Sequence, residues 1–175
     1  MSELRSVAEQ LENNKPVLQH CLQYRPITDN DQAFLLGLYA STRVDEMAIV
    51  PWTDEQKSEF VSMQFNAQHT FYQQQFNQAS FDIVLLGEQM IGRLYVDRRE
   101  QEIRIIDIAI LPDYRRQGIG QQLLQTLLNE AAQSDKAVTI HVEKNNPARS
   151  LYDRLGFDEI EDQGVYSLMQ WLHPQ

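Results

Sequence analysis

Residues 103–142 read IRIIDIAILPDYRRQGIGQQLLQTLLNEAAQSDKAVTIHV, and this stretch decides the fold. Its apolar start predicts a buried strand over Ile103–Leu111, and Pro112 ends it because proline cannot donate to a strand ladder. A second apolar strand is predicted over Ala137–Val142. Between the two strands, apolar residues recur at the spacing of one helix face: Leu123, Leu124, Leu127, Leu128, Ala131 and Ala132. A strand, a helix and a strand in this order imply two parallel neighbours within one sheet.

Upstream of this unit, the sequence predicts one strand and two helices. The strand covers Gln19–Arg25 and stops at Pro26. The first helix has Thr28 or Asp29 as its cap. Its apolar face consists of Phe34, Leu35, Leu38 and Tyr39. A polar loop over Ser41–Pro51 separates this helix from the next one.

The second helix begins at Thr53 and Gln56, which have the spacing of a capping box. The apolar residues expected on its inner face are Phe60, Met63, Ala67 and Phe71. Glutamines crowd the stretch Gln64–Gln78. We interpret them as a solvated helix face.

The remaining elements are short strands and one more helix. The strands of two predicted hairpins are Phe81–Leu86, Met90–Val96, Phe157–Ile160 and Val165–Leu172. The last helix opens at Asn146-Pro147, with proline at its first position, and Gly156 ends it. The predicted order is βααβββαβαββ. This order describes an α/β (α+β) fold with a mixed, mostly antiparallel sheet that contains one parallel pair.

The chain length fits a single domain over residues 19–175, preceded by an extension over residues 1–18. In the extension, Leu4, Val7, Ala8 and Leu11 have helical spacing. Such an amphipathic helix would dock on the body of the protein or on a second subunit, which makes a homodimer one candidate assembly. A loosely attached leader is the alternative.

Composition and charge exclude several classes of partner. The net charge of −10 argues against nucleic acid, because phosphate-backbone binding draws on Lys and Arg. No apolar stretch approaches the roughly 20 residues of a membrane helix. Cys21 is the only cysteine, so no disulfide can form within the chain. We therefore expect a cytoplasmic protein that uses neither nucleic acid nor a membrane.

The loop Arg115–Gly120 has the features of an anion site. It lies between a buried strand and the start of a helix, where free N–H groups and the helix dipole favour an anion. Two other phosphate loops are excluded: Gly120 is followed by Gln121-Gln122, where a Walker loop needs Lys and Ser or Thr. A dinucleotide fingerprint needs a small residue at Leu123.

Two motifs together resemble the GNAT superfamily of acyl-CoA N-acyltransferases. Arg115-x-x-Gly118-x-Gly120 is similar to the Arg/Gln-x-x-Gly-x-Gly/Ala signature of that superfamily. The segment Asn145–Phe157, NNPARSLYDRLGF, resembles its second motif. The resemblance covers nearly everything after Gln19, and the element order predicted above is also the GNAT order. It implies that the parallel strand pair lies at a coenzyme A site.

The resemblance also implies a site for acetyl-CoA as co-substrate. Loop N–H groups would hold the pyrophosphate, the end of the preceding strand would pair with the pantetheine arm, and Asn145 would hydrogen-bond that arm. The implied cofactor-binding residues are Ile108, Ala109, Ile110, Arg115, Arg116, Gln117, Gly118, Ile119, Gly120, Asn145, Ala148 and Tyr152. The N–H of Ile110 would polarise the acetyl carbonyl. Tyr152 would lie near the sulfur as a candidate general acid, with a buried structural tyrosine as the alternative.

A base is needed because an amine with the ordinary pKa of about 10.4 is protonated when it reaches the enzyme and cannot attack. Asp107 is the candidate, since it is the only charged residue within Ile105–Leu111. A carboxylate there should be hydrogen-bonded structurally, face a cleft, or both. Proton transfer along water is the alternative, because the superfamily uses no single fixed base.

Candidates for the acceptor site lie in the loop between the first two core helices. Asp45 and Glu46 could attract a cationic amine, and Trp52 could line the pocket; a solvated acidic loop and a packed tryptophan are the alternatives. No metal is expected, because the four histidines show no metal-site spacing. They are His20, His69, His141 and His173.

These features predict an N-acetyltransferase. Its acceptor would be a primary amine of a small molecule or peptide, which attacks acetyl-CoA directly in a ternary complex. A non-catalytic acyl-CoA-binding sensor is the rival from another class. An acyltransferase for a longer acyl chain is a third reading.

Overall fold

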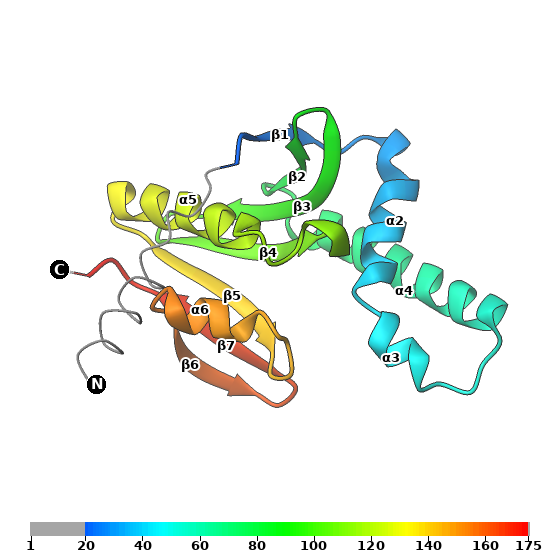
Figure 1. Ribbon diagram of the computed structural model, residues 1–175. Coiled ribbons are helices and arrows are strands. Elements are labelled where there is room, and N and C mark those ends of the chain that lie inside the picture. Colours follow the sequence, from blue (N-terminus) through cyan, green and yellow to red (C-terminus); the bar gives the residue numbers. More distant parts are fainter. Residues whose placement is uncertain (1–19, 175) are drawn as a thin grey trace, which may run out of the picture.

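The computed structural model describes residues 20–174, and Figure 1 shows a seven-stranded sheet with helices on both faces. The predicted helix within residues 1–18 lies outside the described residues. The strand order is β1-β2-β3-β4-β5-β7-β6. The strands are β1 Leu22–Pro26, β2 Ser80–Leu86, β3 Gln89–Arg98, β4 Glu102–Ile110, β5 Ala137–Glu143, β6 Asp158–Gln163 and β7 Tyr166–Trp171.

Five α-helices and two short 3₁₀ turns connect the described strands. The helices are α2 Gln32–Ser41, α3 Val44–Ala48, α4 Asp54–Gln75, α5 Ile119–Ser134 and α6 Arg149–Arg154, and the turns are η1 Asp29–Asp31 and η2 Pro112–Tyr114. The capping box at Thr53 and Gln56 is present at the start of α4. Of these helices, none is both long and apolar enough to cross a bilayer.

The sheet is antiparallel except for the pair β4 and β5. The prediction of a mixed, mostly antiparallel sheet with one parallel pair is therefore confirmed. The parallel ladder is short, because its last pair is Ile105 with Ile140. Beyond that pair, β4 continues to Ile110 and β5 continues to Glu143 without pairing with each other.

A bulge in β4 accompanies this separation. Tyr95 pairs with Asp107 and Val96 pairs with Ile105, so Ile106 is an extra residue in β4. Bulges bend the strand that carries them and increase its local twist. We call the unpaired space between β4 residues 106–110 and β5 residues 141–143 the wedge.

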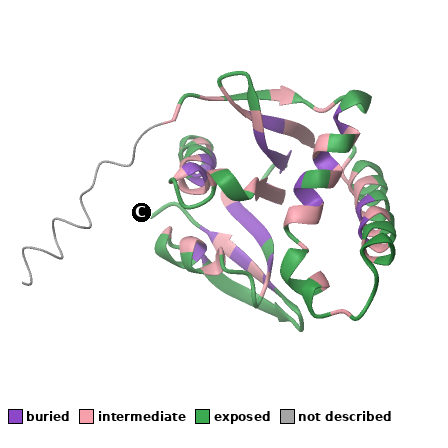
Figure 2. Cartoon of the chain, turned by 45° about the vertical axis from the view of Figure 1, so that its right-hand side comes forward, coloured by how far each residue is buried: buried purple, intermediate pink, exposed green. Residues whose placement is uncertain are grey.

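Each face of the sheet has its own apolar core. The core under α5 and α6 includes Val84, Leu94, Ile105, Leu123, Leu127, Ile140 and Tyr152. The core under α2 and α4 consists of Leu35, Tyr39, Val61, Phe65 and Ile83. Figure 2 shows the buried positions along the central strands and on the sheet-facing sides of the helices. Helices therefore cover an apolar core on each face of the sheet.

Three sequence predictions were wrong in detail. The loop expected over Ser41–Pro51 contains the five-residue helix α3. The first strand begins at Leu22, three residues later than expected. The last helix begins at Arg149, so Pro147 lies in the turn before it and not at its first position.

The predicted inner face of α4 was also wrong. Met63 and Phe71 are exposed, whereas Val61 and Phe65 are the buried residues of this helix. Two apolar sets on α4 both have helical spacing, and the sequence pattern alone did not distinguish which set meets the sheet.

Candidate functional site

The edge of β4 that lines the wedge carries backbone groups without a strand partner. The N–H of Leu111 donates to the carbonyl of Ile91 on β3 at 2.8 Å. Because backbone groups alternate sides along an antiparallel strand, Ala109 also points its N–H and C=O at β3. Ile108 and Ile110 consequently point theirs into the wedge. Within residues 20–174, no strand pairs with them on that side.

Gly92 holds this part of β4 close to β3. A Cβ added at Gly92 would lie 2.4 Å from the carbonyl oxygen of Ala109 and 2.8 Å from Cδ1 of Ile110. Both distances are too short for a real carbon contact. The absence of a side chain at Gly92 therefore sets the position of the strand edge on which Ile110 lies.

The loop Arg115–Gly120 turns its backbone through two left-handed residues. Arg116 has φ 59° and Gly118 has φ 80°. Successive turns of this kind point backbone N–H groups into one concavity that suits an anion. Gly118 caps α5, and the first bond within the helix runs from the N–H of Gln122 to the Gly118 carbonyl at 3.0 Å. The N–H groups before it, which have no helical partner, belong to Ile119, Gly120 and Gln121.

Gly120 has a different role from Gly118. A Cβ at Gly120 would meet Cδ2 of Leu151 at 3.6 Å, which is an ordinary contact. Its missing side chain thus faces α6 and tolerates a methyl group. Gly118 is the position where the backbone conformation itself favours glycine.

The two loop arginines point in different directions. The Arg115 guanidinium donates from Nε to the carbonyl of Ile110 at 2.8 Å and from Nη2 to Oγ of Ser41 at 3.2 Å. It therefore links the loop to the end of β4 and to α2. Arg116 is exposed, and no ion pair of its guanidinium is recorded in the described part of the chain. Arg116 is the loop cation that remains available to a phosphate.

Residues before β1 support the loop. The Gln122 side chain brackets the backbone of His20: its Oε1 accepts from the His20 N–H at 2.8 Å and its Nε2 donates to the His20 carbonyl at 2.7 Å. The His20 ring lies 2.8 Å from the carbonyl of Gln117. Gln117 in turn donates from Nε2 to the Asp113 carbonyl at 2.7 Å. The loop is thus held from both sides.

Asp107, the predicted base, forms an ion pair on the α4 side of the sheet. Its Oδ2 accepts from Nη2 of Arg93 at 2.7 Å and from the Tyr72 hydroxyl at 3.3 Å. Arg93 is 3% exposed and also donates to Gln68 at 3.0 Å. Asp107 thus supplies the counter-ion that this buried guanidinium requires. Burial raises the pKa of the neighbouring Tyr95 to about 12, so that ring stays neutral.

Tyr152 is buried on the inner side of α6. Its ring meets Phe157 edge to face at a centroid distance of 5.5 Å. Burial first, and then the charge of Asp107, raise the pKa of Tyr152 well above its ordinary value. The hydroxyl is therefore a neutral hydrogen-bond donor at physiological pH.

The start of α6 is organised by an asparagine. The N–H of Ala148, which caps the helix, donates to Oδ1 of Asn146 at 2.9 Å. The side chain of the preceding Asn145 is exposed and lies just past the end of β5. Asn146 has a structural role here, and Asn145 is the one free to meet a ligand.

The predicted acceptor residues lie on and near α3. Asp45 is exposed, whereas Glu46 forms an ion pair with Arg43 at 2.8 Å. Arg43 also lies 3.8 Å from Glu143 at the end of β5, which places α3 beside the open end of the wedge. Trp52 is 43% exposed and packs edge to face on an aromatic ring of α4 at 5.2 Å.

Three residues of the site were missed from the sequence. Gly92 interrupts an apolar strand, and an isolated strand glycine marks a close backbone approach. Arg93 is a charged residue inside the same strand, where a counter-ion from a neighbouring strand is required. Tyr72 directly follows Phe71, the last residue of the predicted inner face of α4, and no sequence signal identified it.

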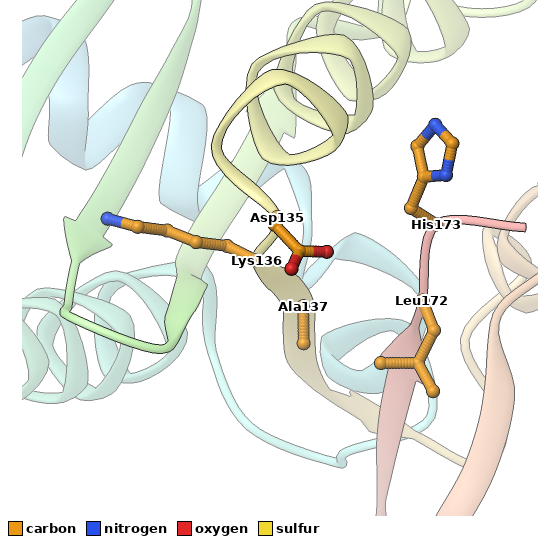
Figure 3. A pocket seen from close by; sticks show the side chains of 5 residues that line it. All are labelled: Asp135, Lys136, Ala137, Leu172 and His173. Atoms are coloured by element: carbon orange, nitrogen blue, oxygen red, sulfur yellow. The ribbon is translucent and has the colours of Figure 1, made fainter. Parts of the chain in front are cut away.

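One surface hollow lies away from this site. It has a volume of about 360 Å³, and its lining residues are Asp135, Lys136, Ala137, Leu172 and His173. Figure 3 shows them around the beginning of β5 and the end of the chain, at the end of β5 opposite the wedge. Across residues 20–174, no cluster of three or more His, Cys, Asp or Glu side chains is arranged for a metal ion.

Comparisons with known proteins agree with this arrangement. The family model described as "Acetyltransferase (GNAT) family" matches residues 44–157. The [ribosomal protein bS18]-alanine N-acetyltransferase of Haemophilus influenzae is 32% identical over 81 residues, which is 46% of this chain and 56% of that protein. An N-alpha-acetyltransferase of Sulfurisphaera tokodaii is 38% identical over 60 residues, 33% of this chain and 36% of that protein.

The fold matches solved structures over most of the chain. The PaiA N-acetyltransferase from Thermoplasma acidophilum, in complex with coenzyme A, superposes with a TM-score of 0.66 at 15% identity. The match covers 87% of this chain and 99% of that one. The chain belongs to the acetyltransferase (GNAT) family, whereas it spans only about half or less of the length of the two curated relatives.

Proposed function

We propose that this protein binds acetyl-CoA in the wedge and transfers its acetyl group to a primary amine by direct attack in a ternary complex. The observation that carries the proposal is the edge of β4 at Ile108 and Ile110, which no strand of residues 20–174 pairs with, next to the anion-binding loop. An extended amide chain can add to such an edge as another strand would. The pantetheine arm of coenzyme A has this chemistry.

The roles of the individual residues follow from their positions. The free N–H groups at the start of α5 and the guanidinium of Arg116 are the groups we assign to the pyrophosphate. The backbone of Ile108 binds the pantetheine arm, together with the side chain of Asn145. The N–H of Ile110 is the donor we assign to the acetyl carbonyl, where it would stabilise developing negative charge.

We assign Tyr152 to the leaving sulfur as a hydrogen-bond donor. Its pKa is raised above the ordinary value of about 10, whereas a thiol has one near 8.5. Complete proton transfer from this tyrosine to a thiolate would therefore be unfavourable. A neutral hydroxyl that donates a hydrogen bond stabilises the thiolate without losing its proton.

The acceptor class we favour is an α-amine, at the N-terminus of a peptide or protein. Asp107 is committed to Arg93 and Tyr72, so the site offers no free carboxylate on β4 as a strong base. An α-amine has a pKa of about 8 and is partly neutral at pH 7, whereas a lysine amine has one of about 10.4. The names of the two curated relatives, an alanine N-acetyltransferase and an N-alpha-acetyltransferase, support the same class.

The proposal includes the organisation and location of the protein. Residues 19–175 form the catalytic domain, and residues 1–18 are an amphipathic extension to it. We place the protein in the cytoplasm, because its single cysteine gives it no use for an oxidising compartment.

Mass spectrometry of acceptor peptides tests the function. The purified full chain is incubated with acetyl-CoA and a peptide with a free N-terminus and one internal lysine. A matched peptide has a blocked N-terminus. We expect one acetyl group on the α-amine of the first peptide and none on the second. Acetylated lysine in both peptides would contradict the α-amine preference.

The dependence of rate on pH provides a second readout. With the α-amine substrate, kcat/KM should rise with pH and level off near pH 8, the pKa of the amine itself. If kcat/KM instead levels off near pH 6 or below, a residue of the enzyme acts as the base. Binding of acetyl-CoA with no acetylated product from any amine would favour the non-catalytic sensor.

A further inference from the structure

A buried ion pair joins β3 and β4, which are neighbours in the middle of the sheet (Figure 1). Arg93 on β3 donates from Nη2 to Oδ2 of Asp107 at 2.7 Å, and Asp107 directly follows Ile106, the extra residue of the bulge. Helix α4 supplies a partner for each charge, since the Tyr72 hydroxyl donates to the carboxylate and Gln68 accepts from the guanidinium. A buried ion pair is often no more stabilising than two apolar residues of similar size. Its place beside the bulge therefore points to a role other than stability.

The bulge decides which face of the sheet each later residue of β4 meets. Before the bulge, Ile103 and Ile105 are buried in the core under α5 and α6. After the bulge, Ile108 and Ile110 pack against that same core. Side chains alternate between the two faces along a regular strand. Odd-numbered and even-numbered residues of β4 can therefore share one face only because Ile106 shifts the alternation by one position.

A strand without the bulge is the alternative register. If Ile106 lay opposite Tyr95, each later residue of β4 would move by one position along β3. Asp107 would then lie opposite Leu94 and point into the apolar core under α5 and α6, where a carboxylate is costly. Arg93 would lose its counter-ion at the same time. Both costs disfavour the alternative register.

The two registers present different backbone groups to the wedge. In the observed register, the N–H and C=O of Ile108 and Ile110 point into the wedge, and those of Ala109 point at β3. Because backbone groups alternate along an antiparallel strand, a slip of one residue reverses this pattern. The backbone of Ala109 would then face the wedge, and the groups of Ile108 and Ile110 would bond to β3.

We propose that Arg93 is a positioning residue: by holding Asp107 on the face under α4, it selects the observed register of β4 and so decides which backbone groups line the wedge. Specifying one register among alternatives is the best-supported role of a buried polar group. Arg93 touches none of the reacting atoms and acts only through the strand. The consequence for acetyl-CoA rests on the proposed function, whereas the choice of register does not.

The expected effect on binding follows from the population of the observed register. Only that register offers the backbone of Ile108 and Ile110 to the pantetheine arm. The apparent affinity for acetyl-CoA is therefore reduced in proportion to the fraction of molecules that have this register. A variant with about one tenth of its molecules in the observed register should bind acetyl-CoA about tenfold more weakly.

Amide hydrogen exchange of the full chain without ligand tests the register directly. The ion pair is replaced as a unit, by Arg93→Met together with Asp107→Leu, because loss of one member alone would leave a buried charge unpaired. Leucine can be buried on either face of the sheet, so it no longer favours one register. Exchange at Ala109 should become faster than in the wild type, and exchange at Ile108 and Ile110 should become slower. Urea unfolding checks that the double variant is folded.

Three further variants are matched to the double variant. Arg93→Lys should keep the wild-type exchange pattern, because a single nitrogen of Arg93 makes both of the hydrogen bonds described above and an ammonium can replace it. Arg98→Met removes another arginine of β3, which pairs with Glu130 on α5, and it should also keep the pattern. Deleting Ile106 from the double variant should restore the wild-type pattern, because a ladder without the extra residue gives every later residue its observed partner.

Three outcomes would overturn the proposal. The first is a folded double variant that keeps the wild-type exchange pattern, and the second is the reversed pattern in Arg98→Met. The third is the reversed pattern in Arg93→Lys, which retains the charge. Calorimetric titration with acetyl-CoA separates this proposal from the proposed function. A wild-type chain that does not bind acetyl-CoA, together with a reversed exchange pattern in the double variant, would refute the function and support the register role of Arg93.

Discussion

Replacing Gly92 by alanine should weaken acetyl-CoA binding without touching the cofactor directly. The added Cβ would lie 2.4 Å from the Ala109 carbonyl oxygen, and an ordinary contact begins at 3.4 Å. The end of β4 must therefore move by about 1 Å away from β3. This movement carries the backbone of Ile110 toward the wedge.

The expected magnitudes follow from this displacement. Overpacking of this kind costs about 1–3 kcal/mol of folding stability. For a chain of this size, 2 kcal/mol corresponds to a drop in Tm of about 4–8 °C. A misplacement of roughly 1 Å at a reacting group can cost about 100-fold in rate. We expect a folded Gly92→Ala protein with kcat/KM reduced by about 10- to 100-fold.

Calorimetric titration with acetyl-CoA, thermal unfolding and thiol-release kinetics measure these three effects. Gly37→Ala is the matched control, because Gly37 lies within α2 and no atom approaches its added Cβ within 4 Å. It should be more stable than the wild type by up to about 1 kcal/mol, with unchanged affinity. Wild-type stability, affinity and rate in Gly92→Ala would refute the role assigned to the close approach of β3 and β4.

Further changes separate the loop, the α4 cap and an acid-sensitive ion pair. Gly120→Ala should retain acetyl-CoA affinity. Gly118→Ala should lose about 1–2 kcal/mol of stability and bind acetyl-CoA more weakly, because the φ of 80° at this position strains any residue other than glycine. Calorimetry and thermal unfolding compare the two variants, and equal behaviour would contradict the different roles of the two glycines. Thr53→Ala removes the cap of α4 and should destabilise the protein by about 1 kcal/mol in urea without changing affinity; a lowered affinity would argue against a purely structural cap. Asp31 is held by Arg25, whose hydrogen bonds lower its pKa, so its contribution to stability is present above pH 4 or so and is lost as pH falls below that. Urea unfolding from pH 6 to pH 2 measures the free energy of unfolding of the wild type and of Asp31→Asn. The wild type should be the more stable of the two at pH 6 and should lose that extra stability toward pH 2. A difference in free energy that stays constant over this range would be inconsistent with the ion pair.

Local sequence patterns predicted the strands and their order because the central strands β2 to β5 are apolar runs and a proline or glycine lies near most strand ends. The parallel pair followed from the helix between β4 and β5. The bulge at Ile106 was not predictable in the same way, because an extra residue exists only relative to a paired strand. The direction of the Ile108 and Ile110 backbone groups depends on that register as well.

The sequence prediction failed where two different sets of residues fit the same helical spacing. Phe60, Met63, Ala67 and Phe71 have the spacing of an inner helix face, and so do the buried Val61 and Phe65. Five residues of α3 are too few to show a period. The loop position was predicted from its glycines, but the turn of Arg115 toward Ile110 depends on contacts between residues far apart in sequence.

Amide hydrogen exchange at single-residue resolution tests the central claim most directly. Without ligand, the N–H groups of Ile108 and Ile110 should exchange much faster than those of Ala109 and Leu111, which are bonded to β3. Saturating acetyl-CoA should slow Ile108 and Ile110 strongly and leave the other two nearly unchanged. Binding of acetyl-CoA with no added protection at Ile108 and Ile110 would contradict the account of the wedge as the cofactor site.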